Sequence, residues 1–536
     1  MRSDDHEHDR NRGTLARQAA ILGGLTLAVF SPTLSSDFVY DARLQILTDP
    51  FLHDPWNWPS VLSFRVLAMD VLDFNRPMHL ASLMLDAAVW GKEPFGYHLT
   101  SILLHAVNVV LVWIVIRDVL GQESIADGPP DPDRQTQRGL AAFLAAVLFA
   151  VHPLVVEAVC EPTFREDLLA AAFTLGAVVL ASRPAVAARN DVWRAAGCGS
   201  MCLLAVASKE SGIAAPFVLA AYGWLIRGGR RGRFWAVAIG GGLACVVAFL
   251  AARFLLEPSP SRIFEARPEY PGGSLLKAMM IEPRILALYA QMILLPVNLA
   301  ADYGLYSVRH LPLWAALAVL GALVMGAAVA ARWDRRVVFG LALLLLPLVP
   351  VSNLVPIYRS AADRYLYLPL AGVACLVGCL LDSTWLAAND RRRQAVMIGA
   401  LVAILGLVTA CVSRQAVWAN QLALWEDAYG KNPVSFTAAS GYAGALREVG
   451  RNEESIELAR QAIALTEGQR GDAWVTLALA LEAAGRAAEA EAMVAKAVEI
   501  DARLADPDAR VAALAMELEE AEGVKRIRAR TKSTSP

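Results

Sequence analysis

The residues best suited to chemistry in this sequence are two carboxylates that follow its first apolar segment. Asp37 and Asp41 lie in the stretch SDFVYD at residues 36–41. A carboxylate at the edge of a membrane is costly to place there, and it can accept a proton from a hydroxyl group. Two interpretations stay open at this point. Either one of these residues is a reacting group, or both are interfacial aspartates that end a helix.

Charged side chains also interrupt the later apolar segments. Carboxylates are suited to proton transfer, whereas arginine and lysine are suited to binding phosphate. A cavity that contained both kinds of group would suit the transfer of a group from a phosphate leaving group to a hydroxyl. The set consists of Arg76, His152, Glu157, Arg165, Asp167, Lys209, Glu210, Arg253, Asp302, Arg359, Asp363 and Arg364.

The composition is that of a polytopic membrane protein. Hydrophobic residues make up 56% and charged residues 19% of the 536 residues, and the mean hydropathy is +0.43. Soluble domains contain about 45–50% apolar residues, which is less than this chain has. The formal net charge of −2 gives no indication of nucleic-acid binding. The seven cysteines form no CxxC pair, which favours buried thiols over a disulfide framework or a thiolate metal site.

The apolar segments predict an all-α membrane domain over residues 16–414 with about eleven spans. Arginines before the first span place the N-terminal residues 1–15 in the cytoplasm, and the arginine runs at 227–233, 332–336 and 391–393 mark further cytoplasmic loops. The predicted spans are 16–34, 97–120, 139–151, 168–181, 195–207, 212–226, 234–255, 311–331, 337–355, 365–381 and 396–412.

Two long loops are predicted on the external side, at residues 35–97 and 256–310. The first contains tryptophans, which favour interfaces, and its segment 58–73 is predicted to form helices on the membrane surface. Residues 285–299 are apolar but too short for a span and contain Pro296, so we expect them to be re-entrant or interfacial. With this topology, the charged residues named above all lie on or near the external side.

The C-terminal part contains a helical repeat that follows a linker at residues 415–432. Residues 433–522 show tetratricopeptide spacing with a period of 35, as in Gly450 and Gly485. Two repeats and a capping helix at 507–522 would form a small solenoid with a concave surface. This solenoid either binds an acceptor polypeptide or only packs against the external face. The basic segment 523–536 is predicted to be disordered.

Several motifs, in this order along the chain, resemble those of GT-C glycosyltransferases. The resemblance is to the transmembrane and tetratricopeptide repeat-containing protein O-mannosyltransferases. It implies a GT-C membrane core with external repeats, a polyprenyl-phosphate sugar donor and a protein hydroxyl as acceptor. The motifs are DFVYD at 37–41, Arg76-Pro77, HPLVVE at 152–157, RED at 165–167, Lys209-Glu210, DRYLYLP at 363–369 and the pair Trp418 and Trp425.

The resemblance also suggests roles for individual residues. Asp41 is the expected general base, and Arg364 with Arg165 or Arg253 is expected to neutralise the donor phosphate. The family often has a second acid after the first, but here Asp41 is followed by Ala42. One carboxylate is a poor cation site, so a divalent cation stays an open question and no other cofactor is indicated. The remaining predicted pocket residues are Asp37, Arg76, His152, Glu157, Asp167, Lys209, Glu210 and Asp363.

Two other classes of function are compatible with the sequence. The first is a membrane-anchored tetratricopeptide scaffold or assembly factor, and the second is a transporter of lipid-linked sugars. A scaffold has no need for buried charges, and a transporter is expected to carry polar residues through to both membrane faces. Both considerations favour an enzyme. The expected location is a bacterial inner membrane, with a cytoplasmic N-terminus and periplasmic repeats.

Overall fold

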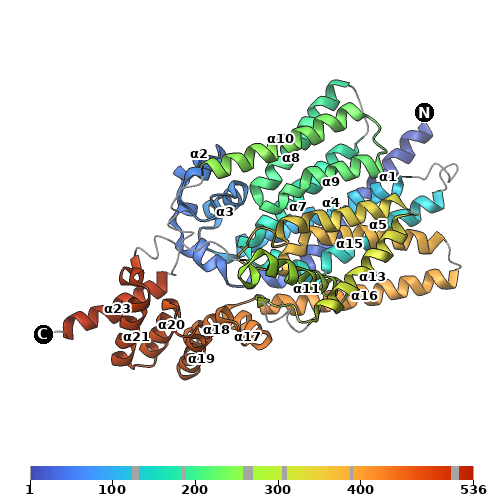
Figure 1. Ribbon diagram of the computed structural model, residues 1–536. Helices are drawn as coiled ribbons and strands as arrows, with labels where there is room; N and C mark the ends of the chain where they lie inside the picture. The colour runs from blue at the N-terminus through green and yellow to red at the C-terminus, as the bar shows by residue number, and fades with distance from the viewer. Residues whose placement is uncertain are drawn as a thin grey trace.

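The computed structural model describes residues 2–122, 132–183, 188–256, 270–304, 311–332, 334–386, 390–508 and 518–534. Over these ranges the secondary structure is helical and contains no β-strand. The predicted all-α class is therefore confirmed. A bundle of long helices forms one part of the molecule, and the C-terminal helices form a second part at one end of it (Figure 1).

Each predicted span overlaps helical structure, although residues 212–226 are divided among three short helices and the prediction 337–355 extends beyond η11, which ends at Val351. Among the described residues, six helices are long and apolar enough to cross a membrane, namely α1, α4, α10, α13, α15 and α16, and a bent pair formed by α5 and residues 153–160 adds a seventh. The other predicted spans are shorter or less apolar helices within the same bundle. The bundle helices are α1 Arg2–Phe30, α4 Pro94–Gly121, α5 Pro132–Val151, α7 Arg165–Ser182, α8 Ala188–Ser208, α9 Ala215–Ala221 with η9 Tyr222–Ile226, α10 Gly232–Leu256, α13 Leu313–Ala331, α14 Arg335–Leu345 with η11 Leu346–Val351, α15 Tyr367–Leu386 and α16 Asp390–Val417.

The outer surface of the bundle is apolar, as lipid contact requires. Only 6% of the apolar stretch of α13, and 6% of that of α16, is buried inside the protein. Large side chains such as Trp314, Met325 and Val402 point outward. A surface of this kind is stable in hydrocarbon and unstable in water. The chain is therefore an integral membrane protein.

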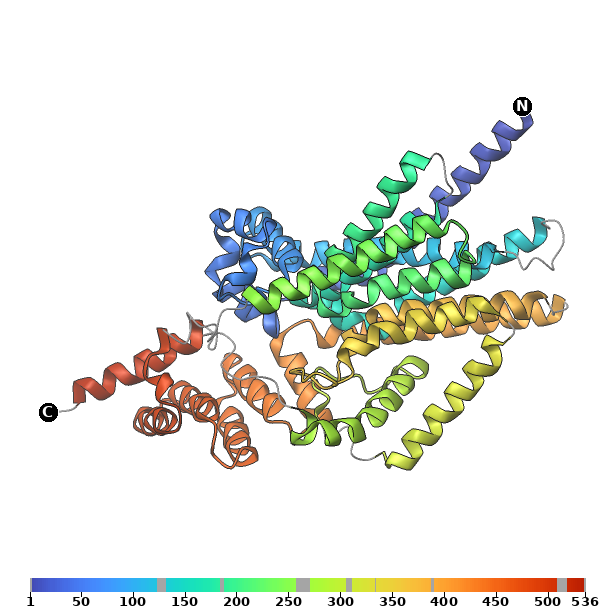
Figure 2. The same cartoon turned by 45° about the horizontal axis from the view of Figure 1, so that its top comes forward.

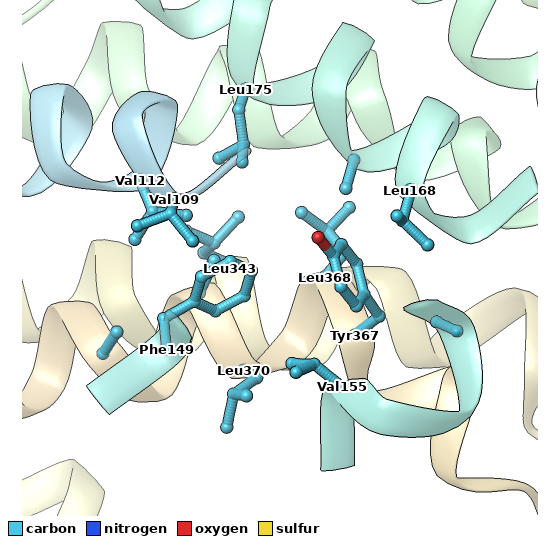
Figure 3. Close-up of a cluster of buried hydrophobic side chains, with 14 of the residues drawn as sticks. Val109, Val112, Phe149, Val155, Leu168, Leu175, Leu343, Tyr367, Leu368 and Leu370 are labelled. Atoms are coloured by element: carbon cyan, nitrogen blue, oxygen red, sulfur yellow. The ribbon is translucent and has the colours of Figure 1, made fainter. Parts of the chain in front are cut away.

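The centre of the bundle is a packed apolar core that contains one group of hydrogen-bonded polar side chains. Side chains of α4, α5, α7, α14 and α15 meet there (Figure 3). The Tyr367 hydroxyl lies 2.7 Å from His105 Nδ1 and accepts a hydrogen bond from Asn108 Nδ2 at 3.1 Å. Asn108 also donates to the Leu168 carbonyl at 2.9 Å. These bonds fix α4 to α7 and α15, because an unpaired polar group there would cost stability.

One end of the bundle carries simple ion pairs between helix ends. Asp118 at the end of α4 binds Arg227 at 2.7 Å, and Asp382 of α15 binds Arg336 at 2.7 Å. The N-terminus and the C-terminal helices lie at opposite ends of the molecule (Figure 2). The bundle therefore has two chemically different ends, and the site described below lies at the end that carries the C-terminal helices.

The first external loop is more helical than predicted. The expected surface helices are present as α2 Trp58–Leu62 and η5 Arg65–Ala68, and the longer helix α3 Pro77–Trp90 was not predicted. The shorter turns are η1 Ser31–Ser35, η2 Arg43–Thr48, η3 Pro50–His53 and η4 Pro55–Asn57.

The apolar segment at residues 285–299 is not an independent short element. Residues 285–294 are the second half of α11 Leu275–Leu294, which follows η10 Pro271–Gly273, and residues 295–299 lie after the end of this helix. One face of α11, with Ile285, Tyr289 and Met292, packs against Leu154 and Leu366. Its contacts are therefore with the polar end of the bundle. Whether it enters the membrane stays a prediction.

The C-terminal helices form two helical hairpins, consistent with the predicted repeats. These are α18 Phe436–Glu448 with α19 Asn452–Leu465, and α20 Gly471–Ala483 with α21 Ala487–Ile500. The turns contain Gly450 and Gly485, with φ of 78° and 77°, a conformation that favours glycine. Small side chains such as Ala459 and Ala490 are fully buried, so paired helices approach closely. The remaining elements are η13 Ala502–Ala505 and α23 Leu518–Thr534.

Two boundary predictions need correction. The basic segment 523–536 is not disordered where it is described, because α23 continues to Thr534. Ala521, Val524 and Ile527 occupy i, i+3 and i+6 and are buried against the repeats. The linker 415–432 contains the end of α16 and α17 Gln421–Lys431, whose Leu424 is buried in the bundle core. Most of the predicted capping helix, 509–517, lies outside the described residues.

Close packing of α14 on α15 gives a test of the bundle. A Cβ added at Gly372 would collide with the backbone of α14, where the Gly340 carbonyl oxygen lies 2.7 Å away. We expect Gly372→Leu to lower stability by about 1–3 kcal/mol, because backbone cannot move aside as a side chain does. Thermal unfolding of the detergent-purified protein measures this. The matched control is Gly399→Leu on α16, where a Cβ meets nothing within 4 Å. Equal melting temperatures for both variants would contradict the packing.

Candidate active site

The side chain of Asp41 is exposed to solvent because contacts fix the conformation of the preceding residue, Tyr40. Tyr40 has a φ of 54°, and such a conformation in a large residue persists only when its surroundings hold it. The Tyr40 hydroxyl accepts a hydrogen bond from Arg359 Nη2 at 2.5 Å, and its ring stacks on Trp425 with centroids 5.4 Å apart. Tyr40 is thus buried, and the backbone turn leaves Asp41 exposed at the edge of a cleft.

Two arginines lie near this carboxylate. Arg359 Nη1 binds Asp302 at 2.8 Å. Arg364 donates to Glu157 twice, from Nη1 at 2.5 Å and from its backbone N–H at 2.8 Å. The Arg364 guanidinium also lies 3.9 Å from the ring centroid of Phe164. The motifs around Glu157 and Arg364, which are far apart in sequence, therefore meet in one buried pair.

The electrostatic environment of Asp41 is mixed. Loss of hydration in the cleft raises the pKa of the Asp41 carboxyl, although the residue keeps contact with solvent. The positive charges of Arg359 and Arg364 act in the opposite direction and lower it. No ion-pair or hydrogen-bond partner occurs for the Asp41 side chain within the described part of the chain. A carboxylate in this state is available to accept a proton.

A second cluster of predicted residues lies beside this pair. Lys209 Nζ binds Glu166 at 3.0 Å and also pairs with Asp167. Arg76 pairs with Glu166 and binds Glu210 at 3.1 Å. Arg253 joins through Glu210 at 3.4 Å. The Lys209 ammonium lies 5.3 Å from the ring of Tyr365, the residue after Arg364, so the two clusters are neighbours.

One group in the described residues has the side chains of a metal site. Ligand atoms of Asp73, His79 and Glu166 lie within 4.8 Å of one another. Burial lowers the pKa of His79 to about 3, so the ring is neutral. However, Arg76 Nη1 already contacts both carboxylates, and its positive charge occupies the position that a cation would take. Asp41 does not belong to this group, so the geometry offers no support for a cation beside it.

Three predicted site residues have other contacts. His152 accepts a hydrogen bond from the Leu154 N–H at 3.3 Å and lies 3.2 Å from the Ile293 carbonyl, so it holds α11 on the bundle. Asp363 is fully buried between Tyr303 and Arg414. Asp37 is exposed and is held through its backbone N–H, which donates to the Ala419 carbonyl at 3.0 Å. None of these side chains lines the cleft at Asp41.

The contacts of Arg165 bear on its predicted role in binding the donor phosphate. Its side chain is completely buried and pairs with Asp86 at 2.6 Å. It also donates to Ser82 Oγ at 2.9 Å, to the Tyr97 carbonyl at 2.7 Å and to Ser101 Oγ at 3.2 Å. These contacts occupy most of the donors of the guanidinium. Arg165 connects α7 to α3 and α4, and its predicted role in binding the donor phosphate stays a prediction that these contacts do not favour.

Three charged residues at this end of the bundle, Arg359, Asp302 and Glu161, were not among the predicted site residues. Arg359 and Asp302 were recognised as charged external residues but received no role. Glu161 was missed: its side chain is fully buried, Oε1 accepts from Thr163 Oγ1 at 2.7 Å, and Oε2 has no hydrogen-bond partner among the described residues. Burial raises the pKa of the Glu161 carboxyl. The available signal was an acid in an apolar run, four residues after Glu157.

Curated proteins with similar sequences are protein O-mannosyl-transferases by name. A protein O-mannosyl-transferase of Caenorhabditis elegans is 24% identical over 450 residues, which covers 81% of this chain and 60% of the relative. The human protein O-mannosyl-transferase TMTC1 is 24% identical over 532 residues, covering 86% and 57%. The chain is a relative of the protein O-mannosyl-transferases. The resemblance predicted from the sequence is thus confirmed.

This relationship covers most of the chain but not most of the relatives. The chain spans about 60% of the length of the Caenorhabditis elegans mannosyl-transferase. A shorter match, to Tmtc3 of Drosophila melanogaster, is 33% identical over 182 residues and covers 31% of the chain and 18% of that protein. No family model matches the chain. Among solved structures, ArnT from Cupriavidus metallidurans bound to undecaprenyl phosphate aligns over 95% of this chain and 88% of that chain, with 14% identity and a TM-score of 0.43.

The structural role of Arg165 can be tested by measuring the stability of variants against unfolding. We expect Arg165→Met to destabilise the protein by about 3–5 kcal/mol, because it leaves the Asp86 carboxylate buried without its counter-ion. The comparison is Arg253→Met, whose ion pair is partly exposed and is expected to contribute at most about 1 kcal/mol. Thermal unfolding in detergent gives both values. A fully stable Arg165→Met protein that failed to bind donor lipid would restore the original assignment.

Proposed function

We propose that this protein is a membrane glycosyltransferase that moves a sugar from a polyprenyl-phosphate donor to a hydroxyl of a protein acceptor. The relatives are named protein O-mannosyl-transferases, which favours mannose as the sugar. The single observation that carries the proposal is the exposed carboxylate of Asp41, which lies in a cleft with Arg359 and in the electrostatic field of Arg364. A proton acceptor and two groups that favour phosphate thus lie at one position.

The proposed reaction uses Asp41 as general base. The acceptor hydroxyl gives its proton to the Asp41 carboxylate while its oxygen forms a bond to the anomeric carbon of the sugar. The bond between that carbon and the phosphate oxygen breaks, and its electron pair leaves with the lipid phosphate. Attack on the face opposite the leaving group inverts the anomeric configuration. Holding both reactants in line supplies a further part of the rate increase.

Arg359 replaces Arg165 in the proposed phosphate site. The Arg359 side chain is 29% exposed and lines the cleft, so it can reach a ligand without unfolding its surroundings. Arg364 is 10% exposed and bound to Glu157. Its charge would act on the developing phosphate negative charge from a fixed position. Asp167, Lys209, Glu210 and Arg76 would shape the adjoining pocket, with Arg253 at its outer edge.

The alternatives are less well supported by the geometry. A scaffold gains nothing from a cluster of buried charges, whose desolvation is costly. A transporter of lipid-linked sugars requires a polar route through the bundle, whereas the centre contains the apolar side chains of Figure 3, among them Val109, Phe149, Leu343 and Leu370.

We also propose an orientation and a location. The arginine-rich helix ends mark the cytoplasmic side, and Arg227 and Arg336 lie at the ends of bundle helices. The C-terminal helices lie at the end of the molecule opposite the N-terminus (Figure 2). The active site and the repeats would then face the external side, which in a bacterial inner membrane is the periplasm.

Replacement of the proposed base tests the reaction. We expect Asp41→Asn to lower turnover by about 100- to 10,000-fold, because an amide cannot accept the proton. The matched control is Asp37→Asn, which removes the other carboxylate of the same stretch and should leave turnover unchanged. Transfer of labelled mannose from a polyprenyl phosphate in purified membranes gives the rates. Mass spectrometry of external proteins from cells carrying each variant identifies the modified residues. Normal transfer by Asp41→Asn would refute the assignment.

The arginine beside Asp41 predicts a change in pH dependence. The rate should fall as pH falls through the pKa of Asp41, since the base must be ionised. Arg359 lowers this pKa, so Arg359→Gln should raise it and move the acid limb to higher pH. Profiles of kcat/KM against pH for wild type and variant measure the shift. A limb that stays in place, or moves to lower pH, would exclude Asp41 as the titrating group or Arg359 as its neighbour.

A further inference from the structure

A cleft of about 330 Å³ lies where the first external loop meets the C-terminal helices. Asp41, Tyr40 and Arg359 contribute the membrane-domain side of the cleft. The opposite side is formed by α18 and α20, the first helices of the two hairpins. The proposed base therefore opens directly onto the inner surface of the repeats.

The repeat side of the cleft combines small residues and hydroxyl groups with Leu479 and the charged residues Arg447, Glu448 and Glu520. It carries the hydroxyl groups of Thr437, Ser440 and Thr476, together with Gly441 and Gly444 on α18. Hydroxyl groups both donate and accept hydrogen bonds, and glycine allows a ligand backbone to approach closely.

The two glycines have different explanations. A Cβ at Gly441 would collide with the ring of Trp425, so the packing of Trp425 on Tyr40 requires glycine there. A Cβ at Gly444 meets nothing within 4 Å. Glycine lowers the stability of a helix interior relative to alanine, and no contact within the described protein accounts for Gly444. Its lack of a side chain keeps open a space that faces the cleft.

The two sides of the cleft are connected by a series of hydrogen bonds and an ion pair. Ser435 caps the start of α18, where its Oγ accepts from the Ala438 N–H at 3.2 Å, and it donates to Asp302. Asp302 in turn binds Arg359, which binds the Tyr40 hydroxyl. This chain of polar contacts connects α18 to the residue before Asp41. A ligand on α18 would therefore meet Asp41 at a fixed distance.

We infer that this cleft is the acceptor site, and that it takes an extended polypeptide segment whose residues next to the reacting hydroxyl are small. The inference rests on the proposed function. Thr476 donates to the Asp472 carbonyl and Ser440 lies 3.1 Å from Thr476 Oγ1, so these hydroxyl oxygens keep acceptor capacity for the backbone N–H groups that an extended segment exposes. A sugar acceptor fits less well, because Trp425 already stacks on Tyr40 and is 9% exposed, leaving no free aromatic face there for a sugar ring.

Transfer assays on the full-length protein test the size limit. The probes are a short synthetic peptide of alanine and glycine with one central threonine, and the same peptide with tryptophan on both sides of the threonine. The donor is mannosyl polyprenyl phosphate. We expect Gly444→Trp to lower transfer to the first peptide by about tenfold or more, and the flanking tryptophans to have a similar effect on wild type. The control is Gly430→Trp on α17, where a Cβ also meets nothing within 4 Å.

A trapping experiment tests the cleft without catalysis. The native cysteines are buried or half-buried, so an introduced cysteine on the surface reacts selectively. The threonine peptide with an added cysteine is supplied as a mixed disulfide with a small aromatic thiol. Attack by the introduced thiolate forms the protein–peptide disulfide and releases the aromatic thiol, and this exchange should be about ten times faster with Ser440→Cys than with Gly430→Cys.

The outcomes separate the two proposals. Trapping at Ser440→Cys without sugar transfer by wild type would overturn the proposed function and keep the cleft as a peptide site. Transfer by wild type with equal trapping at both cysteines, or with full activity in Gly444→Trp, would overturn the acceptor site and leave the proposed function standing.

Discussion

The pairing of buried charges at one end of the helix bundle is the constraint on which the rest of the structure depends. A charge taken out of water near a membrane costs several kcal/mol unless a partner of opposite sign meets it. Glu157 satisfies both the backbone and the side chain of Arg364, and Lys209 lies between Glu166 and Asp167. The Glu157–Arg364 pair joins segments from opposite halves of the membrane domain. The Lys209 pairs connect the start of α7 to the residue that follows α8.

Asp41 stands out against this background of paired charges. Its side chain is exposed at the cleft, and the charges that influence it, Arg359 and Arg364, are bound to other acids. The arrangement provides a reactive group in a rigid setting. The backbone turn at Tyr40 is held by Arg359 and Trp425, and Trp425 belongs to the helix that leads into the repeats. The position of the carboxylate therefore depends on both parts of the molecule.

The repeats are part of the proposed site and not an appendage to it. Their first helix is connected through Ser435 and Asp302 to Arg359, and α17 is packed into the bundle core. Deletion of the repeats would therefore remove one wall of the cleft as well as any acceptor-binding surface. This shared wall explains how a small solenoid can select a segment and hold it against a base in the membrane domain.

The sequence by itself determined the helical class, the order of the bundle helices, the two hairpin turns at Gly450 and Gly485, and the similarity to the mannosyl-transferases. These follow from local signals, namely apolar length, arginine placement and repeat spacing. It also singled out Asp41 and the motifs around Glu157 and Arg364. The helix α23 was missed because its apolar stripe of Ala521, Val524 and Ile527 is short and lies within a charged segment.

Only the tertiary structure decided which charged groups meet. Arg165 and Arg359 look alike in the sequence, yet one is enclosed by Asp86, Ser82 and Tyr97 and the other faces the cleft. The physical reason is that an arginine's role depends on the partners brought to it by helices from elsewhere in the chain. The fully buried Glu161 and the open space at Gly444 belong to the same class of facts, because burial and empty volume are properties of the packed molecule.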